Sequence, residues 1–382
     1  MDTANNTPVV LRLDDPVELL AYLPYRLGFW PEESAVFFAV RSAAHEPDPE
    51  VRWRPGLVAR VDLVDLADPA PDGGARLRRD MLGHLRADGA EIVFMVLYTG
   101  AAPAHAEAGD RWPTGPAGTV TRWWLREGSG ADPSRVWLVS GERYRCLECD
   151  AQPCCPPGGH PLARIRQSRI GAEMVFGGMT YAPSRADLLR HVEVGAALRA
   201  SAVRAAARWR RKQVRAGGSR MAWLSTLAAR WDQALVSTGP LLDRATGADL
   251  GALLVGLEEP LVRDAVLLSV ASGAPVLQVL HDDGEALLAQ VFSPGGEPPE
   301  RDLAARATDV LHHLVAVAAR GRTAQVWAVL AWLAWYEGNG ARADLCLHQC
   351  LEQDPQHRLA SLIRRAVDHG IPPGWARARS VA

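Results

Sequence analysis

The stretch Ala35-Val36-Phe37-Phe38-Ala39-Val40 is an unbroken apolar run, which is typical of a β-strand covered on both faces. A helix signature precedes it at residues 15–18, where Asp15 supplies an N-cap carboxylate, Pro16 the first helical residue and Glu18 a side chain that closes a capping box. We expect this helix to be disturbed at Pro24 and to end near Gly28. A helix followed by a buried strand predicts an α/β fold at this end of the chain.

The next segments extend the same pattern. Residues 57–63 alternate between apolar and polar, which places Val58, Arg60 and Asp62 on one face of a strand. Residues 75–87 have the spacing of an amphipathic helix, and residues 92–97 form a second buried strand. The predicted order is βαβ.

Further along, residues 136–139 and 143–146 are expected to form a hairpin. We expect a helix to end near Gly177, and residues 184–187 to cap a long helix that ends in the basic run 208–212. Almost everything beyond Gly218 has helical spacing. The sequence therefore predicts an α/β domain over residues 1–215 and an all-helical domain over residues 216–382.

Composition excludes several classes of protein. The formal net charge of -2 gives no general attraction to nucleic acid. Lys212 is the only lysine, and it follows Arg211 where a phosphate-binding P-loop requires glycine. No apolar run is long enough to span a membrane without an interrupting charge. We expect a soluble, cytoplasmic protein without a membrane partner.

A cysteine-rich loop at residues 146–160 carries the most concentrated chemistry. Thiolates and imidazole are zinc ligands, and a CxxC pair presents two thiolates to one ion. Packed thiols, a structural zinc site, redox pairing and a catalytic nucleophile all remain open, whereas a disulfide framework is not expected in the cytoplasm. The candidate zinc ligands are Cys146, Cys149, Cys154, Cys155 and His160.

Two groups of charged residues suggest other sites. Arg60 and Asp62 are candidates for a polar site on the sheet, with Arg185 or Tyr144 beside them, although a surface ion pair explains the same pattern. The basic run 204–215, with Trp209 inside it, is compatible with nucleic-acid binding. Helix C-termini favour arginine in any case, so nucleic acid is the less expected partner. The candidate contacts in that run are Arg208, Arg210 and Arg211.

Residues 324–356 have the spacing of one tetratricopeptide repeat, with a further helix after them. One repeat cannot bury its own apolar face, so this helix pair is expected to pack on the preceding helices. Its role is either architecture or binding of a protein partner or a second copy of the chain. We expect Cys346 and Cys350 to be core residues. The spacing rests on Trp327, Leu330, Ala331, Gly338, Ala343, Leu347, Cys350 and Pro355.

The sequence resembles the actinobacterial family known as domain of unknown function 4192. The resemblance rests on the run of Pro, Leu, Gly and Ser positions over residues 15–34, on the turn at 154–159, on residues 183–185 and on the helical end at 328–373. It implies shared architecture without an activity. It also implies that Cys149, Cys154 and Cys155 are the family-like cysteines and that Cys146 is an addition.

These features favour a non-enzymatic binding or regulatory protein. Its α/β half is expected to hold a small ligand or a structural zinc ion, and its helical half to engage a protein partner or itself. One alternative is a metal- or thiol-dependent enzyme that uses the loop 146–160, with Asp62 or Glu148 as acid or base. The other alternative is nucleic-acid binding through the helix at 204–215.

Overall fold

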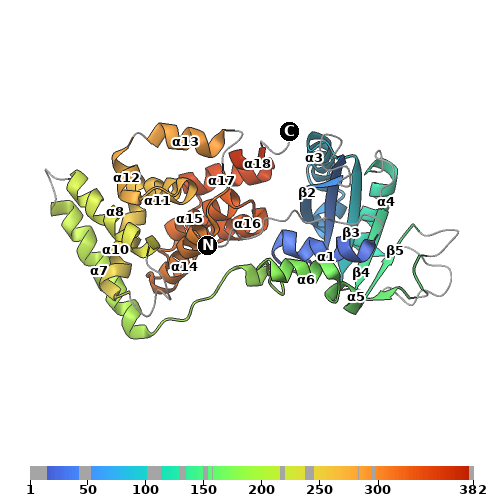
Figure 1. Cartoon of the computed structure of the whole chain (residues 1–382), viewed down its shortest axis with the longest axis horizontal. Coiled ribbons are helices and arrows are strands. Elements are labelled where there is room, and N and C mark those ends of the chain that lie inside the picture. Colours follow the sequence, from blue (N-terminus) through green and yellow to red (C-terminus); the bar gives the residue numbers. More distant parts are fainter. Residues whose placement is uncertain are drawn as a thin grey trace. The chain divides into compact units, whose positions relative to one another are not determined.

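The structure is a computed structural model, and it describes residues 15–42, 53–100, 113–128, 135–148, 154–156, 158–215, 220–236, 245–282, 284–293 and 297–377. The chain divides into two compact units, Met1–Leu188 and Leu189–Ala382. The first contains a sheet with helices around it, and the second is built from helices (Figure 1). The expected α/β half followed by a helical half is confirmed.

The first unit is organised around one mixed, six-stranded sheet with the strand order β2-β1-β3-β4-β5-β6. β1 pairs antiparallel with both β2 and β3, whereas β3 and β4 are parallel and joined through α4. The expected hairpin is confirmed as β4 and β5, with Gly141 at φ 54° in its turn. The strands are β1 (Ser34–Ser42), β2 (Trp53–Asp62), β3 (Ile92–Thr99), β4 (Arg135–Ser140), β5 (Arg143–Cys146) and β6 (His160–Pro161).

Helices cover both faces of this sheet. Alternate residues of β1, such as Phe37, face a buried cluster formed with α2, α3 and α4. The opposite face, which includes Phe38, meets Tyr22 of α1. Because both faces of β1 are covered, an unbroken apolar run is the sequence that suits this strand. The helical segments of this unit are α1 (Pro16–Leu27), α2 (Leu63–Ala67), α3 (Gly74–Ala87), α4 (Gly115–Trp123), η1 (Trp124–Gly128), α5 (Ala163–Arg166), α6 (Arg169–Phe176) and η2 (Ala186–Leu188).

The predicted βαβ order corresponds to β2, α3 and β3, but the two strands are not neighbours. β1 lies between them and pairs with both through Val36, which is opposite Arg60 on β2 and Val96 on β3. The unit therefore uses a split βαβ arrangement. Local sequence patterns reveal strands and helices but not which strand is inserted between two others.

The second unit is a bundle of helices with one continuous apolar core. α15 is buried along the whole stretch from Val326 to Tyr336, as expected for a helix that is apolar all round. The helices are α7 (Ala196–Arg215), α8 (Arg220–Val236), α10 (Gly247–Glu258), α11 (Pro260–Ser272), α12 (Val276–His281), α13 (Gly284–Phe292), α14 (Arg301–Val317), α15 (Ala324–Tyr336), α16 (Gly340–Leu351), α17 (Arg358–Asp368) and α18 (Gly374–Arg377).

The division between the units differs from the expected boundary at 215/216. The basic helix α7 belongs to the second unit because it packs closely along α10. The expected helix cap at 184–187 is also wrong. Ser184 donates a hydrogen bond to Asp187 at 2.7 Å, only the short turn η2 follows, and the long helix starts at Ala196.

α15 and α16 form an antiparallel pair with Gly338, at φ 79°, in the turn between them. Ala331 and Ala343 are fully buried, as the predicted close approach of two helices requires. The expectation that Cys346 and Cys350 are core residues is confirmed. Among the described helices, none has the length and apolar character needed to cross a membrane.

Candidate functional site: an aromatic cavity beside the sheet

Two segments far apart in the sequence run side by side at one end of the sheet. The Trp30 N–H donates to the Ala182 carbonyl at 2.9 Å, and the Ala182 N–H donates to the Gly28 carbonyl at 2.8 Å. Gly28 adopts φ 82°, a left-handed conformation that glycine tolerates and that ends α1. These contacts join the chain at residues 28–30 to Ala182, next to residues 183–185, so they bring together two of the stretches on which the family resemblance rests.

A cavity of about 210 Å³ opens beside these segments. Three aromatic side chains form much of its wall. Tyr25 and Tyr181 meet edge to face at 4.8 Å between ring centroids, and Trp30 lies 6.3 Å from Tyr181. The lining consists of Ala21, Pro24, Tyr25, Trp30, Ile165, Arg166, Gly171 and Tyr181.

Neighbouring side chains hold this aromatic wall in place. Trp30 packs edge to face against Tyr98 of β3, whose hydroxyl is buried. The Tyr25 hydroxyl donates to the Gly171 carbonyl at 3.4 Å. Burial raises the pKa of Tyr25, and the nearby Tyr181 raises it further. The phenol is therefore neutral near pH 7, and the cavity wall carries no phenolate from Tyr25.

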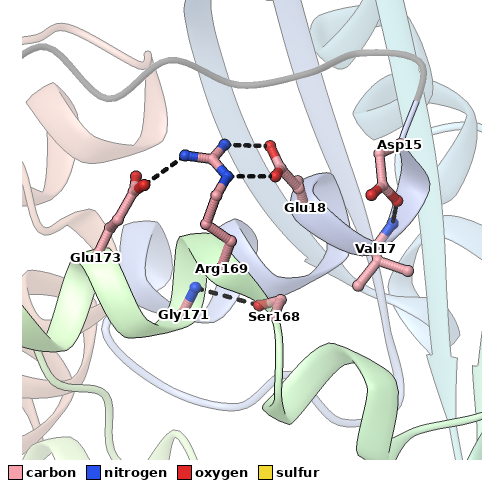
Figure 2. Close-up of polar contacts among 7 residues, drawn as sticks. All are labelled: Asp15, Val17, Glu18, Ser168, Arg169, Gly171 and Glu173. Carbon is pink, nitrogen blue, oxygen red and sulfur yellow. Dashed lines mark hydrogen bonds and ion pairs between the residues drawn. The ribbon is translucent and has the colours of Figure 1, made fainter.

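A half-buried ion pair helps to tie together the two helices beside the cavity. Figure 2 shows the Arg169 guanidinium of α6 binding both oxygens of Glu18 on α1, at 2.9 and 2.7 Å, with Glu173 on its other side. The Glu18 side chain is only 6% exposed, so it depends on this bidentate partner. The Glu18 carboxylate thereby links the two helices that line the cavity.

Side-chain caps fix where these helices begin. The Asp15 carboxylate accepts the Val17 N–H at 2.9 Å, which confirms the predicted start of α1. Ser168 accepts the Gly171 N–H at 3.1 Å at the start of α6 (Figure 2). Pro24 was expected to disturb α1, but the helix continues through it to Leu27, and Pro24 lines the cavity.

The structure brings together the predicted polar site of Arg60, Asp62 and Arg185. Arg60 binds one oxygen of Asp62 at 2.7 Å, and Arg185 lies 3.9 Å from the other. Arg60 also donates to the Glu32 carbonyl at 3.1 Å. The cluster therefore fastens residues 32 and 185, next to the two cavity segments, to the end of β2. Tyr144 is not part of it, since β5 is separated from β2 by three strands.

The cysteine loop lies at the other side of the sheet. Cys154 is bonded in a disulfide, whereas Cys146 and Cys155 are free thiols, and Cys149 lies outside the described residues. The Cys155 sulfur accepts the Cys146 N–H at 3.2 Å and lies 3.6 Å from the Cys154 sulfur. No disulfide framework was expected, but redox pairing in this loop was left open, and the bonded Cys154 is compatible with that alternative.

The described residues of this loop do not fit a zinc ion. A disulfide sulfur has no thiolate to offer. His160 uses both ring nitrogens, because Nε2 meets the Cys154 carbonyl at 3.0 Å and Nδ1 meets Arg164 at 2.8 Å. Burial raises the pKa of the Cys146 thiol, which disfavours its thiolate. Within the described part of the chain, no three His, Cys, Asp or Glu side chains are grouped closely enough for a metal.

The enzyme alternative requires Asp62 or Glu148 beside this loop. Glu148 accepts the Val136 N–H at 2.9 Å, and Asp62 lies on β2, the strand farthest from the β5–β6 edge. Asp62 is therefore not beside the free thiols, whereas Glu148 is close to Cys146: its backbone hydrogen-bonds that thiol, and its negative charge helps to raise the pKa of the thiol, which disfavours the thiolate that a nucleophile requires.

The basic helix uses part of its predicted nucleic-acid surface for its own packing. Arg210 forms a bidentate pair with Glu258 of α10 at 2.7 and 2.5 Å. Trp209 packs on Trp223 of α8 at 5.1 Å. Arg208 and Arg211 are exposed. The stacking residue and the central arginine thus bind other helices, and nucleic-acid binding by this run stays a prediction.

Sequence reasoning missed the cavity and its lining residues Tyr25, Trp30, Arg166 and Tyr181. The available signal was the placement of aromatic residues beside proline and glycine at 24–31 and again at 177–183. Such residues punctuate loops, where binding sites concentrate. The signal identifies two loops without showing that they meet.

The chain belongs to the family described as Domain of unknown function (DUF4192), whose model matches residues 16–374. This match includes the α/β unit from α1 onward and the helical unit as far as α18. Searches of the curated proteins and of the solved structures gave no match. Function must therefore be argued from the site itself.

Proposed function

We propose that the chain is a ligand-binding protein and that its α/β unit takes a small, ring-sized group into the aromatic cavity. The observation that supports this most directly is the wall of Tyr25, Trp30 and Tyr181 around about 210 Å³. Ligand sites are concave and largely aromatic, with few polar groups. This volume lies somewhat below the roughly 300 Å³ at which drug-sized sites begin.

Binding is a better account of this site than catalysis. Among the described residues that line the cavity, none is a Ser, Cys, His, Asp or Glu, the usual nucleophiles and proton carriers. Arg166 is the one charged side chain among the described lining residues. The described lining is therefore better suited to recognising and orienting a ligand than to chemistry on it.

The helical unit supplies a second, more limited proposal. We infer that α15 and α16 form a tetratricopeptide-like pair whose main role is architectural. Support comes from the burial of Ala331 and Ala343 and from the burial of α15 along most of its length. A helix enclosed in this way offers little surface to a partner. The expected protein partner or homo-oligomer stays a prediction.

Ligand-observed NMR with a set of small ring compounds of different charge tests the cavity. Ala21 is buried on α1 and lines the cavity, so Ala21→Leu adds carbon atoms inside it. Ala172→Leu is the matched control, since Ala172 is exposed on the neighbouring helix α6. We expect at least one compound to bind the unmodified chain and the control but not Ala21→Leu.

The proposal is wrong if every bound compound binds Ala21→Leu as well as the control, or if no compound binds at all. Circular dichroism and thermal melting of each variant establish that it is folded. If Ala21→Leu fails to fold, Tyr181→Ala replaces it, because this change removes one wall of the cavity from a loop.

A further inference from the structure

We infer that the ligand of the cavity is a small planar aromatic anion, an aromatic ring that carries one carboxylate or a similar acidic group. This inference rests on the proposed function and names the chemical class that the same site selects. Three features carry it: the size of the cavity, the geometry of its aromatic wall and the sign of its one charge.

The size of the cavity restricts the ligand to about one ring. A dry apolar cavity of about 150 Å³ accommodates benzene. The cavity beside α1 measures about 210 Å³, which leaves room for a six-membered ring with a small substituent. A whole nucleotide or a folded peptide segment exceeds this space.

The aromatic wall favours a flat ring over an aliphatic one. Tyr25 stands nearly perpendicular to Tyr181, at 87°, and Trp30 is inclined to Tyr181 by 37°. An inserted ring meets both edges and faces of this wall, and either offset-stacked or edge-to-face contacts are favourable. Each such aromatic pair contributes roughly 0.5–1.5 kcal/mol beyond burial of apolar area.

The charge in the lining selects an anion. Aromatic cages also attract cations through the faces of their rings. Here, however, Arg166 lines the cavity, and no carboxylate does so among the described lining residues. Arg166 has Glu142 as a partner at 3.6 Å, but both side chains are more than half exposed, so water screens this pair. Its guanidinium can therefore bind a ligand carboxylate, to which its forked geometry is suited.

The neighbouring helix end adds to the same preference. Gly171 lines the cavity from the first turn of α6, where the helix dipole places partial positive charge. The closest carboxylate on α1, that of Glu18, is already bound by Arg169. Arg166 and this helix end therefore both favour an anion over a quaternary ammonium group.

Competition against 4-fluorobenzoate, followed by ¹⁹F NMR of that probe at constant ionic strength, tests the ligand class. The competitors are benzoate, cyclohexanecarboxylate and phenyltrimethylammonium, added to the full chain. We expect benzoate to bind at least tenfold more tightly than phenyltrimethylammonium and at least threefold more tightly than cyclohexanecarboxylate. Arg166→Gln is expected to weaken benzoate about tenfold and to leave the cation unchanged or slightly stronger. Arg164→Gln, an exposed arginine outside the lining, is the matched control.

The outcomes separate the ligand class from the proposed function. Equal or tighter binding of the cation, equal binding of the aliphatic acid, or no loss in Arg166→Gln overturns the aromatic-anion class. In each of these cases, binding that Ala21→Leu abolishes still supports a ligand cavity. The aromatic-anion class is also wrong if the anionic ring does not bind but a neutral ring does, and Ala21→Leu abolishes that binding. The ligand cavity itself would still be supported by this outcome. If no compound shows binding that Ala21→Leu abolishes, both the aromatic-anion class and the proposed ligand-binding function are wrong.

Discussion

His312 shows how a single buried side chain links stability to pH. It lies on α14, only 4% exposed, with its ring 6.3 Å from that of Trp327 on α15. Its pKa is lowered to about 4, mainly by burial and also by the positive charges of Arg342 and Arg190, which the nearby Asp309 offsets only in part. The folded protein therefore holds a neutral imidazole at pH values where the unfolded chain is already protonated.

The sign of the effect follows from the lowered pKa. Above the ordinary pKa of 6.5, His312 is neutral in both states and stability does not depend on it. Between pH 6.5 and about 4 the unfolded chain takes up the proton first, so acidification favours unfolding. At roughly 1.4 kcal/mol per pKa unit, this group removes about 3 kcal/mol of stability by pH 4.

The His312→Gln variant should lose this part of the acid sensitivity, because glutamine does not titrate. Denaturant unfolding at a series of pH values from 7 to 4 measures it. His348→Gln, at an exposed position of α16, is the matched control and should keep the wild-type profile. Coinciding pH profiles for His312→Gln and the wild type would contradict the assignment.

At the scale of elements, the contact between α7 and α10 depends on small residues. A Cβ atom added at Gly251 of α10 would lie 2.6 Å from the Ala205 Cβ of α7 and 2.6 Å from the Ala206 nitrogen. Gly247, one turn earlier, meets Ser201 in the same way. The two helices therefore pack with their backbones close together, and neither glycine can be enlarged without moving α7.

Gly251→Ala is expected to destabilise the protein by about 1–3 kcal/mol, since overpacking outweighs the better helix propensity of alanine. Gly83→Ala is the matched control, because Gly83 lies in α3 with nothing within 4 Å of an added Cβ. That control should be neutral or more stable by about 0.5–1 kcal/mol. Chemical denaturation of both variants measures the difference, and equal effects would argue against the close α7–α10 contact.

At the scale of the whole molecule, the boundary between the units determines which fragments can fold. The second unit begins at Leu189, and its core contains Ala202 and Ala206 from α7. A fragment of residues 189–382 keeps α7, whereas a fragment of residues 216–382 loses it and exposes the surface of α10 that α7 covers. We expect residues 1–188 and 189–382 each to fold and residues 216–382 to be much less stable.

Circular dichroism, thermal melting and limited proteolysis of the three fragments test this expectation. The fragment 189–382 should melt in one cooperative transition and resist protease. A fragment of residues 216–382 that is equally stable and equally resistant would show that α7 belongs elsewhere.

How much of the structure could be predicted depends on how far each signal acts along the chain. Asp15 and Pro16 mark the start of α1, and Gly28 marks its end, because caps act within one helical turn. The apolar run at 35–40 indicates a doubly covered strand for a similarly local reason. The alternation of apolar and polar residues predicted that Arg60 and Asp62 lie on one face of a strand. The structure shows that Arg60 and Arg185 both lie beside the Asp62 carboxylate.

The sequence alone was sufficient for the family resemblance, the order of an α/β half followed by a helical half, the apolar strands β1 and β3, the hairpin at β4–β5 and the buried cysteines of α16. Tertiary structure was required for the insertion of β1 between β2 and β3, the start of the second unit at Leu189 and the aromatic cavity. The cavity depends on hydrogen bonds that join Gly28 and Trp30 to Ala182. No local pattern encodes a contact across that separation, because it forms only when the sheet and its covering helices bring the two loops together.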